Sequence, residues 1–367
     1  MLCVAALTLL LLAVPGCVDA SKRRPTSWLG FHAGQWPGAD WRPYSADSPF
    51  NVPISAHVRV HPRSRAIVER ILSWGVPARL VAGTSDTGDD YGHPTYYARS
   101  SDPVYRLRPT MQWGRSPIRG VRIHVPAAAR PAGGSDGHMT VVQPNGWEYD
   151  FWRASSKPPS GGTLRFGWGG RVRIDGSGTG GEATASGFGN LAGIVRAPEL
   201  AAGRIDHALF VVVRCTSGDG SFHFGVRRPH DRNQSAFVYP ATHGGSRCPA
   251  SERGAPPMGA RLQLAMSGAE IDALGLPEWK RAILHALARY GGYVGDTGGP
   301  GFAIQLESGS TYTAFGYADP LLGFAAQSGG ETDGSVQEYE GRYLFDIASG
   351  VDWASRLRVV TPPRPAG

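Results

Sequence analysis

The chain has 367 residues, a hydrophobic content of 41% and a formal net charge of +7. Its 51 glycines and 29 prolines are spread along the whole chain, which predicts many turns between short strands rather than disorder. The absence of a fixed repeat argues against solenoids and propellers, and the basic residues form no stripe dense enough to bind nucleic acid.

The first twenty residues predict an export signal. The apolar stretch from Ala5 to Val14 has the length of a signal-peptide core and is too short to span a bilayer. Two processing sites compete, a signal-peptidase site ending at Ala20 and a lipobox-like stretch that would place a lipid on Cys17. We therefore expect an extracellular protein, either secreted or lipid-anchored to the outer face of the membrane. Residues 21–44 are expected to form a linker, and residues 45–362 a single β-rich domain.

Two of the four cysteines, Cys215 and Cys248, lie in the body of the chain. In an oxidising compartment such a pair predicts a disulfide. No CxxC or HxxxH spacing accompanies it, so a zinc site is not expected.

The predicted elements are mostly strands. A short helix is expected to begin near Pro62. The clearest helix spans 277–290, where Trp279, Ile283 and Leu287 form one apolar stripe and two glycines follow. The expected strands lie at 112–125, 139–152, 164–174, 205–215, 222–226, 261–266, 303–305, 312–315, 343–347 and 357–360. The fold class predicted is a β-sandwich or jelly roll with one packed amphipathic helix.

The hairpin over 138–153 is the most informative stretch of the sequence. Asn145-Gly146 is a strong signal for a two-residue turn, which would pair Pro144 with Trp147. That register divides the side chains between two faces. One face would carry Met139, Val141, Gln143, Glu148, Asp150 and Trp152, and the other His138, Thr140, Val142, Tyr149, Phe151 and Arg153.

The two faces predict different carbohydrate chemistry. On the first, Asp150 and Glu307 are the acid/base candidates of a hydrolase, and Glu148 assists. On the second, His138 and Tyr149 are the proton-transfer groups of a lyase, with His207 as a further candidate. Substrate contacts are assigned to Trp152 as a stacking platform and to Arg153 and Gln143. An ordinary core face beside a wet surface is the structural alternative.

The other motif matches give weaker evidence for a function. The GxGxxG match at Gly176, Gly178 and Gly181 lacks a βαβ context, and Ser135 in a GxSxG match precedes a strand rather than a helix. Asp296 is explained as a turn residue. No cofactor is expected. Asp86, Asp89 and Asp90 are a candidate calcium site, but they lack the EF-hand spacing, and a solvated acidic loop is the preferred interpretation.

Several ordered blocks resemble a group of secreted β-rich proteins of actinobacteria and fungi. They are HMTVVQP, YDFWRA, AGRIDHALFVVV, PPMGARLQL and ALARYGGYVGDTGG, and the likeness extends from about Ser45 to Val360. The jelly-roll character of that group is similar to that of polysaccharide lyases and some glycoside hydrolases. The resemblance implies a fold and supplies no catalytic motif.

These observations together predict an extracellular carbohydrate-active enzyme, a glycoside hydrolase or polysaccharide lyase, that acts as a monomer on a polysaccharide. The alternative is a non-catalytic protein that binds cell-wall glycan. A secreted protease or esterase is a third hypothesis.

Overall fold

The computed structural model describes residues 30–85, 87–182, 184–217, 236–299, 301–329 and 334–361. Strands make up 26% of the molecule and helices 17%, so the prediction of a β-rich fold is confirmed. The strands form four sheets, none of them a closed barrel. The described residues form more helices than the two expected from the sequence, near Pro62 and at 277–290.

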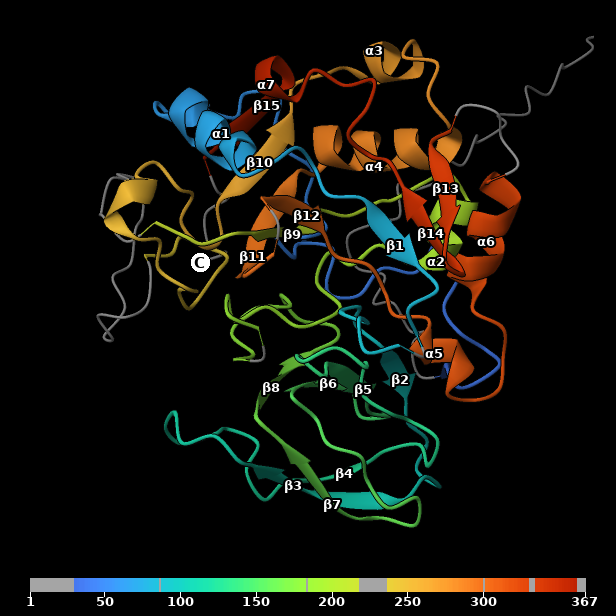
Figure 1. Ribbon diagram of the computed structural model, residues 1–367. Coiled ribbons are helices and arrows are strands. Elements are labelled where there is room, and N and C mark those ends of the chain that lie inside the picture. Colours follow the sequence, from blue (N-terminus) through green and yellow to red (C-terminus); the bar gives the residue numbers. More distant parts are fainter. Residues whose placement is uncertain are drawn as a thin grey trace, which may run out of the picture.

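The upper half of the molecule in Figure 1 is built on a five-stranded main sheet. Its order is β12 (Phe302–Ile304), β9 (Leu209–Val213), β11 (Gly292–Thr297), β10 (Arg261–Leu264) and β15 (Leu357–Val360). Only β9 and β11 run parallel. Both are almost fully buried, which explains the near-continuous apolar sequence of β9.

Helix α4 (Glu278–Arg289) contacts β10 and buries Trp279, Ile283 and Leu287, as the periodicity predicts. Pro277 precedes the helix as its N-cap residue. Helix α1 (Ser64–Ser73) contacts β15. The other helices are short: α2 (Ala197–Ala201), α3 (Gly268–Asp272), α5 (Ser310–Thr313), α6 (Pro320–Ser328), α7 (Trp353–Arg356) and the 3-10 turn η3 (Ala250–Glu252). The strand expected at 312–315 is wrong, because α5 and the turn after it occupy that segment.

A second, small sheet contains β1 (Leu80–Ala82), β14 (Arg342–Phe345) and β13 (Val336–Tyr339). The body also extends N-terminal to the expected domain start. Trp41 and Tyr44, in the segment expected to be a linker, are buried in the largest core.

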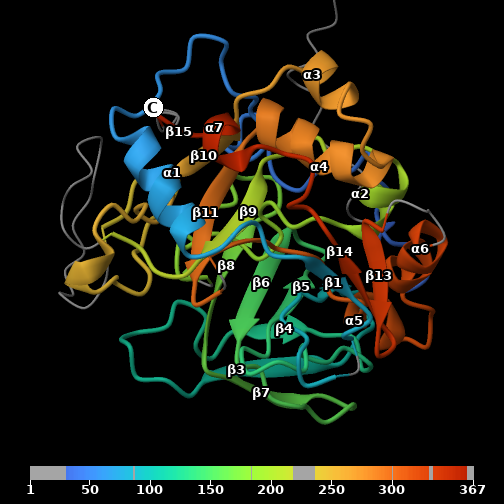
Figure 2. The ribbon, with the colours of Figure 1, turned by 45° about the horizontal axis from the view of Figure 1, so that its top comes forward.

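Two further sheets form the lower half of Figure 1. We call β2 (Thr95–Tyr97), β5 (Met139–Val142), β6 (Trp147–Trp152) and β8 (Trp168–Arg173) the inner sheet. We call β4 (Arg122–His124), β3 (Val104–Pro109) and β7 (Gly162–Phe166) the outer sheet. Apolar side chains between them form a second, separate core. The opposite face of the inner sheet packs on the largest core, so both of its faces are covered (Figure 2).

The hairpin register differs by one residue from the expected one. The observed pairs are Val142 with Glu148 and Thr140 with Asp150, and Gln143 accepts a bond from the Gly146 N–H. The loop therefore has three residues and ends at Gly146, whose φ of 84° suits the left-handed position of such loops. A register shift of one residue changes which side chains of the two strands lie on the same face of the sheet. The carboxyls consequently share a face with Thr140 and Val142, not with Met139 and Val141.

The predicted disulfide between Cys215 and Cys248 is confirmed. It closes a loop over a sequence separation of 33 residues. Part of that loop, and the strand expected at 222–226, lies outside the described residues.

Candidate functional site

Polar side chains cross the inner sheet in rows on the face that meets the largest core. The register places Thr95 beside Thr140 and Thr140 beside Asp150. Two residues further toward the sheet end, His93 and His138 lie with their ring centroids 4.6 Å apart. Trp152 pairs with Trp168 at the same end. Because side chains alternate along strands, these histidines and tryptophans lie on the same face as Thr140 and Asp150. We call this end of the inner sheet, with His93, His138, Trp152 and Trp168, the rim.

His93 is the best-defined group of this rim. Its side chain is 2% exposed, and its Nδ1 lies 2.9 Å from the Asn190 carbonyl oxygen. A carbonyl oxygen only accepts, so Nδ1 carries the proton and Nε2 keeps its lone pair. Burial lowers the pKa of His93 to about 3, and it lowers the pKa of His138 to about 4. Both imidazoles are therefore neutral at physiological pH.

Asp136 connects these histidines to the tryptophans. Trp152 donates from Nε1 to the carboxylate of Asp136 at 2.9 Å. The negative charge of Asp136 also acts on His93, where it raises the pKa against the larger effect of burial. The Arg153 N–H donates to the Asp136 carbonyl, and Arg153 itself has a φ of 51°. Such left-handed backbone at a bulky residue is uncommon and tends to occur at functional sites.

Asp296 approaches the same place from the main sheet. It follows a register shift in β11 after Val294, and such bulges often re-aim a side chain near a site. Burial, and next the charge of Asp136, raise the pKa of Asp296 to about 7, although the side chain keeps partial solvent access. A carboxyl group of this kind is protonated over part of the physiological range and able to act as a general acid.

The tryptophans form an exposed aromatic surface beside Asp136. Trp113 is 64% exposed and stacks on Trp152 with ring centroids 5.3 Å apart. Trp168 lies 5.9 Å from Trp113, and the Arg153 guanidinium lies 5.3 Å from the Trp152 ring. Because most of the Trp113 indole is exposed to solvent, it offers an apolar surface on which a ligand ring can stack.

Glu148 and Asp150 lie behind the rim, and both are 0% exposed. Glu148 accepts from the Tyr44 hydroxyl at 2.8 Å and from the Leu191 N–H at 3.0 Å. Asp150 accepts from the Thr140 hydroxyl at 2.8 Å, and its second oxygen has no other hydrogen-bonding side chain or backbone group in the described structure. Burial raises the pKa of Glu148 to about 7, and burial together with the charge of Glu148 raises the pKa of Asp150 well above its usual range.

The remaining predicted residues lie elsewhere. Glu307 is buried and accepts from the Tyr312 hydroxyl at 3.1 Å, and burial raises its pKa to about 7. No hydrogen bond joins it to Asp150 in the described part of the chain. His207 is buried against Glu199, with a 3.0 Å contact from its Nε2. Whether Asp150, Glu148, Glu307 or His207 takes part in catalysis stays a prediction.

Tyr149 and Gln143 belong to the packing of the lower half. Tyr149 is 3% exposed in the second core, where its hydroxyl accepts from Arg171. Gln143 bonds through both amide atoms to the backbone of His124 and thereby joins β5 to β4.

The acidic loop expected near residue 90 is only partly solvated. Asp89 pairs with Arg342 at 3.0 Å, and Asp90 is buried and accepts from the Ser308 hydroxyl. Asp86 lies outside the described residues. Within the described ranges no group of three or more His, Cys, Asp or Glu side chains is placed to hold a metal ion. Ser135 is an exposed loop residue.

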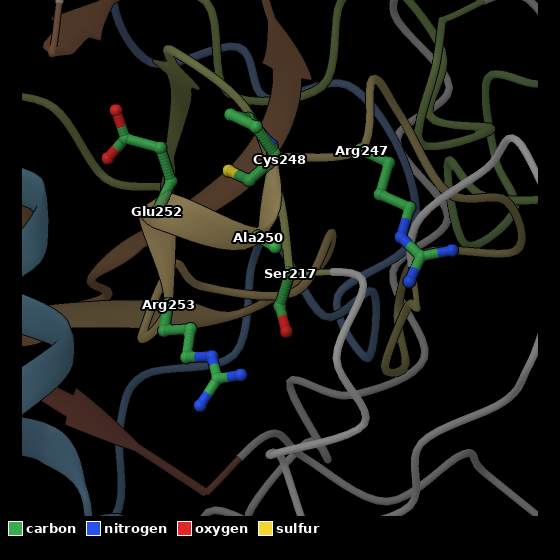
Figure 3. A pocket seen from close by; sticks show the side chains of 7 residues that line it. Ser217, Arg247, Cys248, Ala250, Glu252 and Arg253 are labelled. Atoms are coloured by element: carbon green, nitrogen blue, oxygen red, sulfur yellow. The ribbon is translucent and has the colours of Figure 1, made fainter.

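A cavity of about 350 Å³ lies apart from this site, beside the disulfide. Figure 3 shows Ser217, Arg247 and Arg253 around it. Residues 218–235, which follow Ser217 directly, are outside the described part, so this cavity does not define a site.

Three residues of the rim were not among the sequence-predicted site residues. His93 and Asp136 lie in loop segments, and Asp296 reads as a turn residue. The signal for them is weak: Asp136 and His138 flank Gly137, and His93 precedes a proline. They come from separate segments of the chain, and the charge of Asp136 acts on both His93 and Asp296.

No family model, no curated protein and no solved structure matches the chain. Among the described helices none is long and apolar enough to cross a bilayer.

Proposed function

We propose that the protein is an extracellular carbohydrate-active enzyme that cleaves a polysaccharide at the rim of the inner sheet. One observation carries the proposal. A largely buried carboxyl group with a raised pKa, Asp296, senses the charge of a second carboxylate, Asp136, and that carboxylate bonds to Trp152, on which the exposed Trp113 stacks. An acid and a carboxylate are the pair that glycosidic cleavage uses, and an aromatic surface beside them can hold a sugar ring.

The roles follow from the protonation states. Asp296 donates its proton to the departing glycosidic oxygen. In hydrolysis the Asp136 carboxylate serves as base or nucleophile. In elimination from a uronate the Nε2 of His93 takes the proton next to the sugar carboxylate, and Arg153 offsets the charge of that carboxylate. The acid role goes to Asp296 rather than to Asp150 because Asp150 has no solvent access.

The test is a panel of neutral and acidic polysaccharides, with products measured as reducing ends and as absorbance of unsaturated uronates. Asp296→Asn is expected to lower kcat about 100-fold or more, the usual weight of a general acid. Asp175→Asn is the matched control, since this carboxylate pairs with Arg173 away from the rim. Full turnover by Asp296→Asn would remove the proposed acid.

The alternative is a glycan-binding protein without catalysis, which the 64% exposure of Trp113 favours by itself. Retention on an insoluble glycan, with no products from any polysaccharide of the panel, would select it. Trp113→Ala separates glycan binding from catalysis, because it is expected to weaken binding about fivefold while leaving kcat nearly unchanged.

A further inference from the structure

A single peptide unit connects the rim to the buried carboxyl groups. The N–H of Leu191 donates to Glu148 at 3.0 Å. The carbonyl of Asn190, which belongs to the same peptide unit, accepts from His93 Nδ1 at 2.9 Å. In a trans peptide these two groups point in opposite directions from one rigid plane. Glu148 and His93 therefore bind the two sides of that plane.

We infer that Glu148 is a positioning residue that acts through the Asn190–Leu191 peptide to hold His93 with its proton on Nδ1 and its Nε2 lone pair available at the rim. The consequence for catalysis rests on the proposed function, since a free Nε2 matters there as a proton acceptor. The positioning itself does not depend on which polysaccharide is cleaved.

Asp150 completes the arrangement by sharing a proton with Glu148. Two ionised carboxylates in contact and out of water would repel each other strongly, so one of them retains a proton. The Coulombic effect of Glu148 on Asp150 marks Asp150 as the protonated member. Its second oxygen accepts no hydrogen bond in the described chain, which suits the oxygen that carries this proton.

Above about pH 7, the value to which burial raises its pKa, Glu148 carries the negative charge that attracts backbone N–H groups. Besides Leu191, the Asn190 N–H lies against both carboxyl groups and lowers the pKa of each. The other ionisable groups that face the pair are the Tyr44 and Tyr97 hydroxyls, and burial raises the pKa of both. A charge-assisted bond on one side of a peptide also polarises its carbonyl, which strengthens the bond from His93.

The inference is tested by NMR of the full-length protein with ¹⁵N-labelled histidine, because long-range couplings report which ring nitrogen carries the proton. In the wild type we expect His93 to be neutral with the proton on Nδ1. Glu148→Leu removes the acceptor, so the Nδ1 form is expected to lose its dominance and the proton affinity of the ring, which the Asn190 carbonyl raises, to fall about tenfold. Glu148→Gln retains an acceptor for Leu191 and is expected to preserve the wild-type state.

Two controls accompany these variants. Glu307→Leu removes an equally buried carboxyl group that bonds Tyr312 instead, and the His207 signals report a buried ring bound to Glu199. Glu307→Leu is expected to leave the His93 tautomer unchanged, and Glu148→Leu is expected to leave the His207 signals unchanged. A proton on Nε2 in the wild type overturns the inference, even where Glu148→Leu does not fold. So does an unchanged His93 in folded Glu148→Leu, or an equal change in Glu307→Leu. Absence of any polysaccharide cleavage, with the tautomer as expected, rejects only the proposed function.

Discussion

At the scale of single residues, burial decides the chemistry of the rim. The same desolvation keeps His93 and His138 neutral and keeps Asp296 protonated close to neutral pH. A base and an acid thus coexist in their reactive forms at one pH, which solvent-exposed side chains of these types would not do.

The first prediction concerns the pH dependence of activity. Asp296 has to be protonated to act as the acid, and its pKa is raised to about 7. We expect kcat to fall as the pH rises through about 7, and Asp296→Asn to abolish this falling limb along with most of the activity. Rates across a pH series in buffers of constant ionic strength check this. A limb that persists in the residual activity of Asp296→Asn would assign it to another group.

The second prediction concerns stability and the buried pair. The folded-state pKa of Glu148 and of Asp150 lies above the unfolded value, so between these values the folded protein binds more protons than the unfolded chain. Their contribution to the free energy of unfolding is present at low pH and is lost as the pH rises toward about 7. His93 and His138 act in the opposite sense, because their lowered pKa values make the unfolded chain bind more protons.

Comparison with Asp150→Asn isolates the contribution of the carboxyl pair. The amide is isosteric with a protonated carboxyl group and cannot ionise. We expect the variant to be more stable than the wild type near pH 8, by about 1–3 kcal/mol or more, and this advantage to shrink as the pH falls toward about 4, the unfolded pKa of an aspartate. Urea unfolding at the two pH values measures this. An identical pH dependence in both proteins would mean that the folded state does not raise the pKa of Asp150.

At the scale of elements, the loop of the β5–β6 hairpin decides which side chains share a face. Gly146 takes a left-handed conformation that an alanine adopts at a cost. Gly146→Ala is therefore expected to lower the free energy of unfolding by about 1 kcal/mol. Thermal unfolding followed by circular dichroism measures the change.

Gly323→Ala is the matched control for that variant. Gly323 lies inside α6, and a Cβ there would meet open space. Alanine is expected to stabilise this position by about 0.5–1 kcal/mol. Equal effects of the two substitutions would contradict the assigned loop geometry.

The observed helices and strands also show which sequence patterns were sufficient to predict an element's position. Helix α4 and strand β15 lie where their local patterns predict them, because each pattern reports a continuous buried face. The hairpin turn was located correctly and its register was not. A two-residue and a three-residue loop both fit Asn145-Gly146, and the choice depends on packing that lies far away in sequence.

At the scale of the whole molecule, the inner sheet lies between two separate cores. Covering both faces places Glu148 and Asp150 inside the molecule and leaves only the rim of the sheet near solvent. The proposed site is consequently at the meeting of the inner and main sheets, a position typical of ligand sites between packed units.

The disulfide is expected to stabilise the molecule as a whole. A crosslink over 33 residues stabilises by about 3–4 kcal/mol when its effect is on the unfolded chain. The double variant Cys215→Ala/Cys248→Ala should therefore lose about that much in urea unfolding, with little change in polysaccharide turnover. A large loss of kcat in a folded double variant would instead connect this region to the active site.

The sequence alone determined the β-rich class, the main helix and the disulfide, because each depends on composition, local periodicity or a single available pairing. Only the tertiary structure decided that both hairpin faces are buried and that His93 and Asp296 lie within reach of the charge of Asp136. These residues come from separate segments, and their approach depends on strand pairing and on the packing of two sheets, which no local pattern specifies.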